Sequence, residues 1–182
     1  SAGFLETARA NLAGRVALHQ GSAGDIPLED AAVDVVVSGL VLNFVTDQPA
    51  ALEEMRRVAR PGGAIAAYVW DYAGKMDMMR FFWDAASEMD PTAAQLAESI
   101  RFSLCTPDRL ERLFAGAGLE QVAVAPIEIA TIFSNFDDYW QPFLGGQGPA
   151  PTYAMSLDAG ARARLRDRLE ERLPVQPDGS IP

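Results

Sequence analysis

The chain has 182 residues, 49% of them hydrophobic, which is enough length and apolar content for one folded domain with a buried core. Fifteen basic and twenty-five acidic residues give a formal net charge of −10, and this excess of acid excludes nucleic acid as an expected partner. The single cysteine, Cys105, excludes an internal disulfide, and no apolar run reaches the ~20 residues of a membrane span, so a reducing cytoplasm is the expected location.

The first part of the chain predicts a helix and then two strands. Apolar residues recur at helical spacing over residues 2–13, and Gly14 ends the run. Residues 16–20 are a short strand candidate before a turn-rich stretch. Residues 32–38 are apolar on both faces apart from Asp34, so we expect a strand that helices cover on both sides.

A second helix and another strand follow. Asp47 is the predicted cap of a helix over residues 48–60. The Pro-Gly-Gly sequence at 61–63 is expected to end this helix, because proline and glycine do not continue it. Residues 64–70 then predict the next buried strand.

The pattern becomes helical after this strand. Residues 76–89 carry a broad apolar helix face, and a further helical stretch covers 91–102, so we expect an inserted helical lid. Thr106 and Pro107 start another helix, which ends at Gly116.

The last third predicts one strand and two helices. Residues 122–132 alternate around a proline, which indicates a strand with a bulge or bend. Ser134 and Asn135 are expected to cap a short aromatic helix over 136–143, and a loop rich in glycine and proline follows at 145–151. Leucines at helical spacing between residues 157 and 173 predict the final helix.

Five segments of the first 71 residues follow one another in an order that is typical of a known enzyme fold. They are the Gly21-Ser22-Ala23 turn with Ile26-Pro27-Leu28 behind it, the strand entry Val33-Asp34-Val35, the loop 40–47, the helix stop 57–63, and the strand exit Trp70-Asp71. Together they resemble the class I S-adenosylmethionine-dependent methyltransferases. The resemblance implies an α/β fold, namely a partial Rossmann-like, doubly wound and mostly parallel sheet with a helical insertion after the fifth strand.

The resemblance also implies which part of a methyltransferase domain this is. The third to sixth strands would be residues 16–20, 33–38, 64–70 and 122–132. The domain would be incomplete at both ends, since the family's glycine-rich loop and ribose-binding acid would precede Ser1. We therefore expect the segment alone to bind its cofactor poorly and to be inactive.

Three parts are expected within this incomplete domain. Residues 1–72 would form the cofactor-side core, residues 73–105 the helical lid or insertion, and residues 106–182 the C-terminal substrate-side part.

The resemblance implies that S-adenosyl-L-methionine binds at Ser22, Ala23, Gly39 and Leu40. Ser22 stands where the family has an acid that accepts a hydrogen bond from the adenine amino group, and its uncharged hydroxyl makes a weaker bond. Ala23 would offer its backbone N–H to an adenine ring nitrogen. Gly39 and Leu40 follow the fourth strand, at the sheet edge where ligands of open α/β sheets bind. Asp25 is the alternative acid, and a solvated turn residue is its other interpretation.

Other residues keep two interpretations each. Asn43 either faces substrate or caps a helix start, and Gly39 either touches the cofactor or only allows close packing. Phe4 either packs beside adenine or belongs to the core. His19, the single histidine, is interpreted as structural.

Four aromatic residues, Trp70, Tyr72, Tyr139 and Trp140, either wall a substrate pocket or form an apolar cover over the sheet. Tyr72 or Asp71 would assist proton removal in the first case. The segments 69–72 and 139–143 also resemble methyltransferases of the ubiquinone/menaquinone-type superfamily.

The predicted function is methyl transfer to a small molecule by in-line attack, which needs alignment more than covalent chemistry and requires no catalytic base. No metal site is expected, because the sequence has no Cys/His cluster that could hold a structural metal. Specific catalytic residues are not assigned. One alternative is a methyltransferase-like binding module without turnover. A short-chain dehydrogenase is disfavoured, because no tyrosine precedes Lys75, the single lysine, by four residues.

Overall fold

The computed structural model describes residues 2–12 and 14–182, which divide into two compact units. The first unit contains the chain up to Val69 together with Arg112–Val122, and the second contains Trp70–Glu111 and Ala123–Pro182. Among the described residues, no helix has the length and apolar character to cross a membrane. The two units are described in turn.

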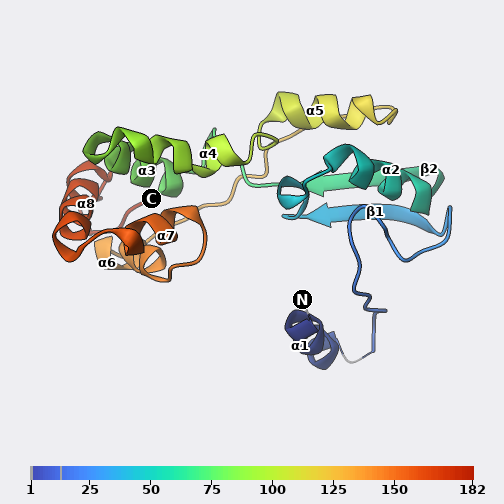
Figure 1. Ribbon diagram of the computed structural model, residues 1–182, viewed down its shortest axis with the longest axis horizontal. Helices are drawn as coiled ribbons and strands as arrows, with labels where there is room; N and C mark the ends of the chain where they lie inside the picture. The colour runs from blue at the N-terminus through green and yellow to red at the C-terminus, as the bar shows by residue number, and fades with distance from the viewer. Residues whose placement is uncertain (1, 13) are drawn as a thin grey trace. The chain divides into compact units, whose positions relative to one another are not determined.

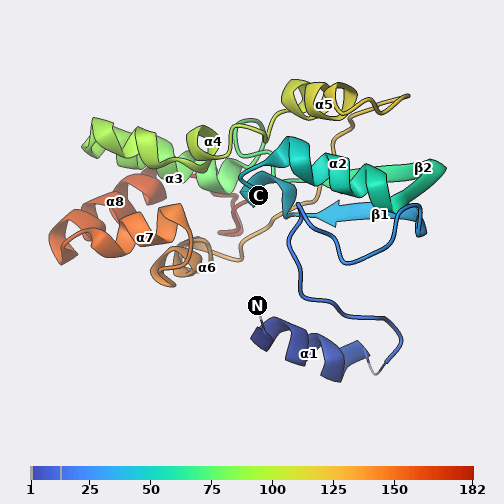
Figure 2. The same cartoon turned by 45° about the vertical axis from the view of Figure 1, so that its right-hand side comes forward.

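The first unit is built around a strand–helix–strand motif (Figure 1). Strands β1 and β2 pair in parallel, and the helix between them lies along the pair, as Figures 1 and 2 both show. The elements are α1 (Ala2–Leu12), β1 (Val33–Gly39), the 3-10 helix η1 (Leu42–Phe44), α2 (Gln48–Val58) and β2 (Ala59–Tyr68). The α/β class and the parallel pairing are as predicted, with two strands in the sheet among the described residues. Residue 13, the last of the predicted first helix, lies outside them.

Helix α2 forms where its cap and apolar spacing predict it. The carboxylate of Asp47 accepts a hydrogen bond from the Ala50 N–H at 3.0 Å, which satisfies one of the unpaired donors of the first turn. Leu52, Met55 and Val58 are buried on the face toward the strands. The predicted cap is confirmed.

The Pro-Gly-Gly sequence does not end this helix, contrary to the prediction. Helix α2 ends at Val58, and the extended residue Ala59 already pairs with Val33. The sequence 61–63 lies inside β2, where the register shifts between the pairs Val33–Ala59 and Val35–Ala64. Glycine is required there, because a Cβ at position 63 would stand 2.7 Å from a backbone oxygen of β1.

The two strands are open on one face, whereas the sequence predicts cover on both. Val35 and Val37 are 58% and 60% exposed, and Tyr68 is 47% exposed. Side chains alternate across a strand, so these residues lie on the face away from α2. Strand β2 also ends at Tyr68, two residues before its predicted end at Trp70.

Two predicted strands are wrong. Residues 16–20 and 122–132 contain no strand in the described structure. A strand needs a neighbour for its backbone N–H and C=O groups, and neither segment has a ladder partner there. Ile127 and Ile129 consequently remain 78% and 69% exposed.

The second unit is helical. Its helices include α3 (Asp77–Met89), η2 (Pro91–Leu96), α4 (Glu98–Arg101), α6 (Phe136–Trp140), η3 (Gln141–Leu144), α7 (Pro149–Ser156) and α8 (Ala159–Arg172), while α5 (Pro107–Gly116) spans the boundary between the units. The predicted cap Asn135 is confirmed, since its side chain accepts from the Asp138 N–H at 3.0 Å. The predicted loop 145–151 is wrong from Pro149 onward. Proline fits the first position of a helix because no N–H partner is needed there.

Aromatic rings fill the core of the second unit. Phe82 is fully buried and stacks on Phe143 with ring centroids 4.5 Å apart. The buried carboxylate of Glu98 accepts hydrogen bonds from the indole N–H of Trp83 and the backbone N–H of Ala150. These bonds connect α3, α4 and α7, and they satisfy a group whose burial is costly without partners.

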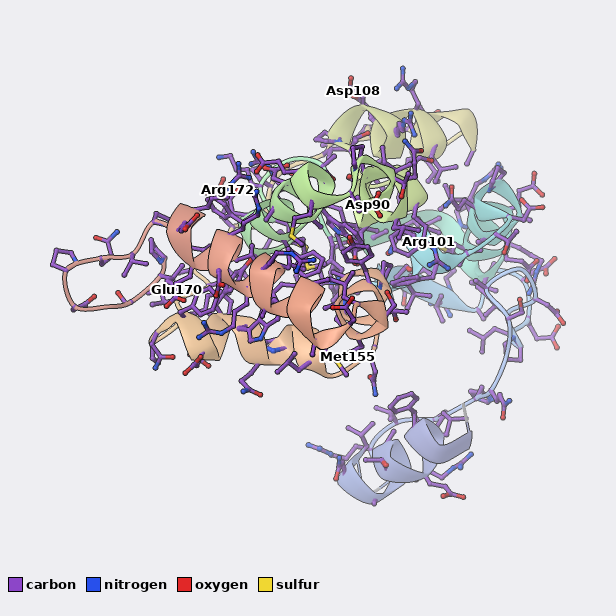
Figure 3. The ribbon with its side chains drawn as sticks, turned by 60° about the vertical axis from the view of Figure 1, so that its left-hand side comes forward. Asp90, Arg101, Asp108, Met155, Glu170 and Arg172 are labelled. Carbon is purple, nitrogen blue, oxygen red and sulfur yellow. The ribbon has the colours of Figure 1, made fainter. Side chains whose placement is uncertain are left out.

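Ion pairs also join the last helix, whose Leu165 and Leu169 are buried in this core, to α3. Arg168 and Arg172 of α8 both pair with Glu88 of α3. Figure 3 shows Glu170 and Arg172 near the C-terminal end of α8, where Glu170 pairs with Arg166 one turn earlier at 3.0 Å.

Candidate functional site

The turn predicted to carry the adenine-binding residues is anchored on α2 by Arg57. The guanidinium of Arg57 donates to the backbone oxygens of Ile26 and Leu28 at 2.9 and 2.8 Å, and to the carboxylate of Asp30 at 2.8 Å. It also forms a two-bond pair with Glu54, one turn earlier on the helix. A planar fork of donors suits this arrangement, which a lysine does not reproduce.

Glu54 completes this Arg57 clamp. Its Oε2 accepts the backbone N–H of Ile26 at 2.9 Å, so the pair holds both the N–H and the C=O of that residue. Hydrogen bonding from Arg57 lowers the pKa of Glu54 to about 2, and Glu54 in turn raises the pKa of Arg57. A lowered folded-state pKa means that this contribution is present above pH 4.5 and is lost as the pH falls toward 2.

The turn itself is closed by local hydrogen bonds. Ser22 and Asp25 form an isolated antiparallel bridge, with the Asp25 N–H donating to the Ser22 oxygen at 3.1 Å. The Ser22 hydroxyl accepts the Gly24 N–H at 3.2 Å, which leaves one lone pair and its own proton for a ligand. Within the described residues, the backbone N–H of Ala23 donates to no protein acceptor.

Gly39 and Leu40 lie at the carboxyl end of β1, as predicted. Gly39 is the register partner of Tyr68, and the Leu40 N–H donates to the Tyr68 oxygen at 2.9 Å. Leu40 has φ of 54°, in the left-handed region that non-glycine residues seldom adopt. A Cβ on Gly39 would meet the Tyr68 hydroxyl at 2.4 Å, so the phenol ring lies directly over this glycine.

Segment 22–31 follows α2 back toward this end of the sheet. The Ala31 N–H donates to the Arg57 oxygen near the end of the helix, whereas the Ile26 N–H bonds to Glu54 one turn closer to its start. Helix α2 starts on the side of the carboxyl end of β1 and returns to the start of β2. Moving back along the segment from Ala31 therefore leads toward that carboxyl end. A shared corner of residues 21–23 and 39–40 stays a prediction.

Comparison with known proteins finds a family match for the part of the chain that contains these residues. Residues 1–67 match a family described as a methyltransferase domain. The resemblance of this part to class I S-adenosylmethionine-dependent methyltransferases is thereby confirmed.

Individual relatives extend the similarity. Malonyl-[acyl-carrier protein] O-methyltransferase of Serratia marcescens is 48% identical over 66 residues, which are 35% of this chain and 24% of that protein. Arsenite methyltransferase of Halobacterium salinarum is 29% identical over 133 residues, or 72% of this chain and 32% of the relative. The ubiquinone/menaquinone biosynthesis C-methyltransferase UbiE of Shewanella sp. (strain ANA-3) is 31% identical over 125 residues, or 61% and 48%. The chain thus spans less than half of the length of each of these relatives.

The structure defines the surroundings of Phe4, Asn43 and His19, which all lie within residues 1–67. Phe4 is 79% exposed, so its interpretation as a core residue is wrong. Asn43 is not the cap of α2, because Asp47 has that role, and it is buried in η1 instead. His19 is exposed in an extended segment that is not a strand.

The sequence did not single out Arg57, Glu54 or Tyr68. The sequence analysis includes Arg57 only in the helix stop 57–63. The feature that could have indicated its role is Glu54, an acid three residues earlier on the same helix, with which Arg57 forms an ion pair. Tyr68 was not singled out, because the predicted strand continues to Trp70 and Tyr68 is therefore not expected at its end. Glu54 and Arg57 both bond to the backbone of Ile26, three residues after Ala23. Tyr68 is the register partner of Gly39.

The aromatic residues of the second unit have separate environments. Tyr139 and Trp140 are buried in the aromatic core, and the Tyr139 hydroxyl donates to the Met78 oxygen at 2.8 Å. Their burial supports a packing role for Tyr139 and Trp140 over a role in a substrate pocket. Burial raises the pKa of Tyr72 to about 12, so its phenol stays protonated at neutral pH and is a poor proton acceptor. The side chain of Asp71 accepts the Gly74 N–H at 2.8 Å.

Alkaline pH is expected to destabilise the second unit. Burial raises the pKa of Tyr72 to about 12 and that of the Cys105 thiol to about 11, from ordinary values of 10 and 9. Both folded-state pKa values are raised, so the stabilisation is complete below pH 9 and is lost as the pH rises toward 12. The urea midpoint of unfolding, measured between pH 8 and 11.5, should therefore fall. The variants Tyr72→Phe and Cys105→Ala should each flatten this decline, and equal slopes in all three proteins would contradict the assignment.

Proposed function

We propose that this chain is part of an enzyme that transfers a methyl group from S-adenosyl-L-methionine to a small molecule. The observation that carries the proposal is the methyltransferase-domain match over residues 1–67, which contains the whole β1–α2 motif and its carboxyl edge. When bound, the cofactor would supply a sulfonium methyl group: an acceptor atom would bond to the methyl carbon in line as the carbon–sulfur bond breaks, and S-adenosylhomocysteine would leave. Alignment of the two reactants is then the main contribution of the protein.

The described residues fit such a cofactor. The backbone N–H of Ala23 has no acceptor within residues 2–12 and 14–182, and Ser22 keeps a lone pair for the adenine amino group. Gly39 and Leu40 lie where ligands of parallel sheets bind, at the carboxyl end of β1. The left-handed backbone of Leu40 is a strained feature of the kind that gathers at ligand sites.

Leu40→Asn tests this assignment by calorimetric titration with S-adenosylmethionine to millimolar concentration, because weak binding is expected. Asparagine tolerates the left-handed backbone, so the fold should keep its unfolding midpoint while the apolar contact with the cofactor is lost. We expect the dissociation constant to rise by about tenfold, the factor that corresponds to ~1.4 kcal/mol of lost contact. Val41→Asn, one residue later and 51% exposed, is the matched control. Equal affinities of Leu40→Asn and the unchanged protein would refute the role of Leu40.

A binding module without turnover is the second candidate. It is favoured by one observation, namely that an uncharged hydroxyl, already bonded to Gly24, stands where the family has an acid. The two candidates differ in product. Release of S-adenosylhomocysteine with an added acceptor supports the enzyme, whereas cofactor binding without release across a broad acceptor panel supports the module.

A further inference from the structure

Met155 is the most exposed of the six methionines, all of which lie within the described residues. It is 45% exposed, whereas Met55 is buried and Met78, Met79 and Met89 pack against the aromatic core. Near the end of α7, it lies on the outer surface of the second unit (Figure 3). An oxidant in solution therefore reaches this thioether first, because exposure governs which sulfur reacts.

The sulfur of Met155 also has a charged neighbour. Nη1 of Arg162, in the first turn of α8, donates to the Met155 Sδ at 3.2 Å. A thioether is only a weak hydrogen-bond acceptor, so this contact satisfies little of the donor capacity of a guanidinium, which has five N–H groups.

The other arginines of α8 have stronger partners. Arg166, Arg168 and Arg172 each pair with a carboxylate. Arg162 donates to no oxygen within residues 2–12 and 14–182, and the side chain of Asp158, which precedes the helix, accepts from a backbone N–H instead. The remaining N–H groups of Arg162 are therefore available to a molecule that approaches the sulfur.

We propose that Met155 and Arg162 form a peroxide-reactive pair, in which Met155 is a site of oxidation to methionine sulfoxide. A lone pair of the sulfur attacks one oxygen of a hydroperoxide and the O–O bond breaks. The proton of the attacked oxygen passes to the departing oxygen, which leaves as water or an alcohol. Sulfur loses two electrons and the peroxide gains them.

Arg162 assists this step because negative charge develops on the departing oxygen. A guanidinium N–H beside the sulfur can donate to that oxygen in the transition state, where such a bond is stronger than in the ground state. The bond from Nη1 to Sδ leaves the second lone pair of the thioether free for the attack. Exposure and the neighbouring cation thus act together at this methionine.

The product suits the same partner. A sulfoxide is polar, and its oxygen forms a charge-assisted bond with a guanidinium, which is stronger than a bond to a neutral thioether. Oxidation of Met155 should therefore strengthen the link between the end of α7 and the start of α8. Oxidation of a buried methionine has the opposite effect, because it disrupts packing.

Peptide mass spectrometry of the folded chain in hydrogen peroxide tests the pair through the oxidation rate of each methionine. We expect Met155 to react first, and its rate to fall about tenfold in Arg162→Gln, the factor for one charge-assisted bond lost from the transition state. Arg164→Gln, two residues later on α8, is the matched control and should keep the rate. Equal Met155 rates in all three proteins, or faster oxidation of another methionine, would overturn the proposal.

Thermal unfolding tests the product separately. Peroxide is limited so that only Met155 is oxidised, and the treated chain should then unfold at a higher midpoint than the untreated chain. Met155→Leu has no sulfur to oxidise there, so the same treatment should leave its midpoint unchanged. In Arg162→Gln the rise should be absent. A lower midpoint for the oxidised chain, or an equal rise without Arg162, would refute the bond between Arg162 and the sulfoxide.

Discussion

Arg57→Ala is expected to release the turn that carries Ser22 and Ala23 from helix α2. The substitution removes every guanidinium bond to Ile26 and Leu28 and leaves Glu54 without its partner. The backbone N–H of Ile26, which Glu54 holds at 2.9 Å, should then exchange with solvent about tenfold faster or more. Native-state hydrogen exchange followed by NMR measures this directly.

The neighbouring arginine supplies the control for the Arg57 clamp. Arg56 precedes Arg57 on α2, but its guanidinium donates to the Ala117 oxygen at 2.7 Å, in another segment. Arg56→Ala should leave the exchange of the Ile26 N–H unchanged, and Arg57→Lys should protect it only in part, because a lysine lacks the planar fork. Equal loss of protection in the Arg56 and Arg57 variants would contradict the clamp.

Release of the turn should also change the position of Ser22 and Ala23, the residues proposed to bind the cofactor. Misplacement of a binding group by about 1 Å costs roughly 100-fold in catalysis, so in the whole enzyme of which this chain is proposed to be part, Arg57→Ala should impair methyl transfer more than it impairs folding. A variant with normal transfer and an unprotected Ile26 amide would show that the position of the turn does not matter for activity.

Phe82→Ala should cost about 3–5 kcal/mol of the free energy of unfolding, the usual loss for a buried phenylalanine. Phe82 is fully buried, stacks on Phe143 and contacts Trp83 edge to face at 5.2 Å. Truncation leaves a cavity between helices that pack through this ring. Urea unfolding monitored by tryptophan fluorescence measures this loss of unfolding free energy.

An exposed phenylalanine is the matched control for Phe82. Phe4 is 79% exposed, and Phe4→Ala should change the unfolding free energy by no more than about 0.5 kcal/mol. Phe82→Leu should cost less than the alanine variant, because leucine refills most of the space. A loss at Phe82 no larger than that at Phe4 would show that the aromatic cluster does not stabilise the unit.

Local signals in the sequence were sufficient for most helices and for the parallel strand pair. Asp47 and Asn135 cap helices where predicted, because a cap acts through the next three residues only. Strands depend on distant partners, and for that reason residues 16–20 and 122–132 were mispredicted. The Pro-Gly-Gly sequence was misleading, since its glycines serve a bulge in β2 and not a helix end.

The candidate site was predictable only to the level of its backbone positions. Gly39 and Leu40 follow from the end of a strand, which apolar runs indicate. The Arg57 clamp and the burial of Asn43 depend on which side chains meet in space, which a single sequence does not encode locally. The ring of Tyr68 over Gly39 likewise depends on the register between β1 and β2.

The most direct test of a cofactor corner at residues 21–23 and 39–40 is an amide chemical-shift map of the ¹⁵N-labelled chain titrated with S-adenosylhomocysteine to millimolar concentration. We predict that the largest shifts fall on Ala23, Leu40 and their immediate neighbours, in both segments together. Shifts confined to the helical second unit, shifts in one segment without the other, or no shift at all would contradict the account.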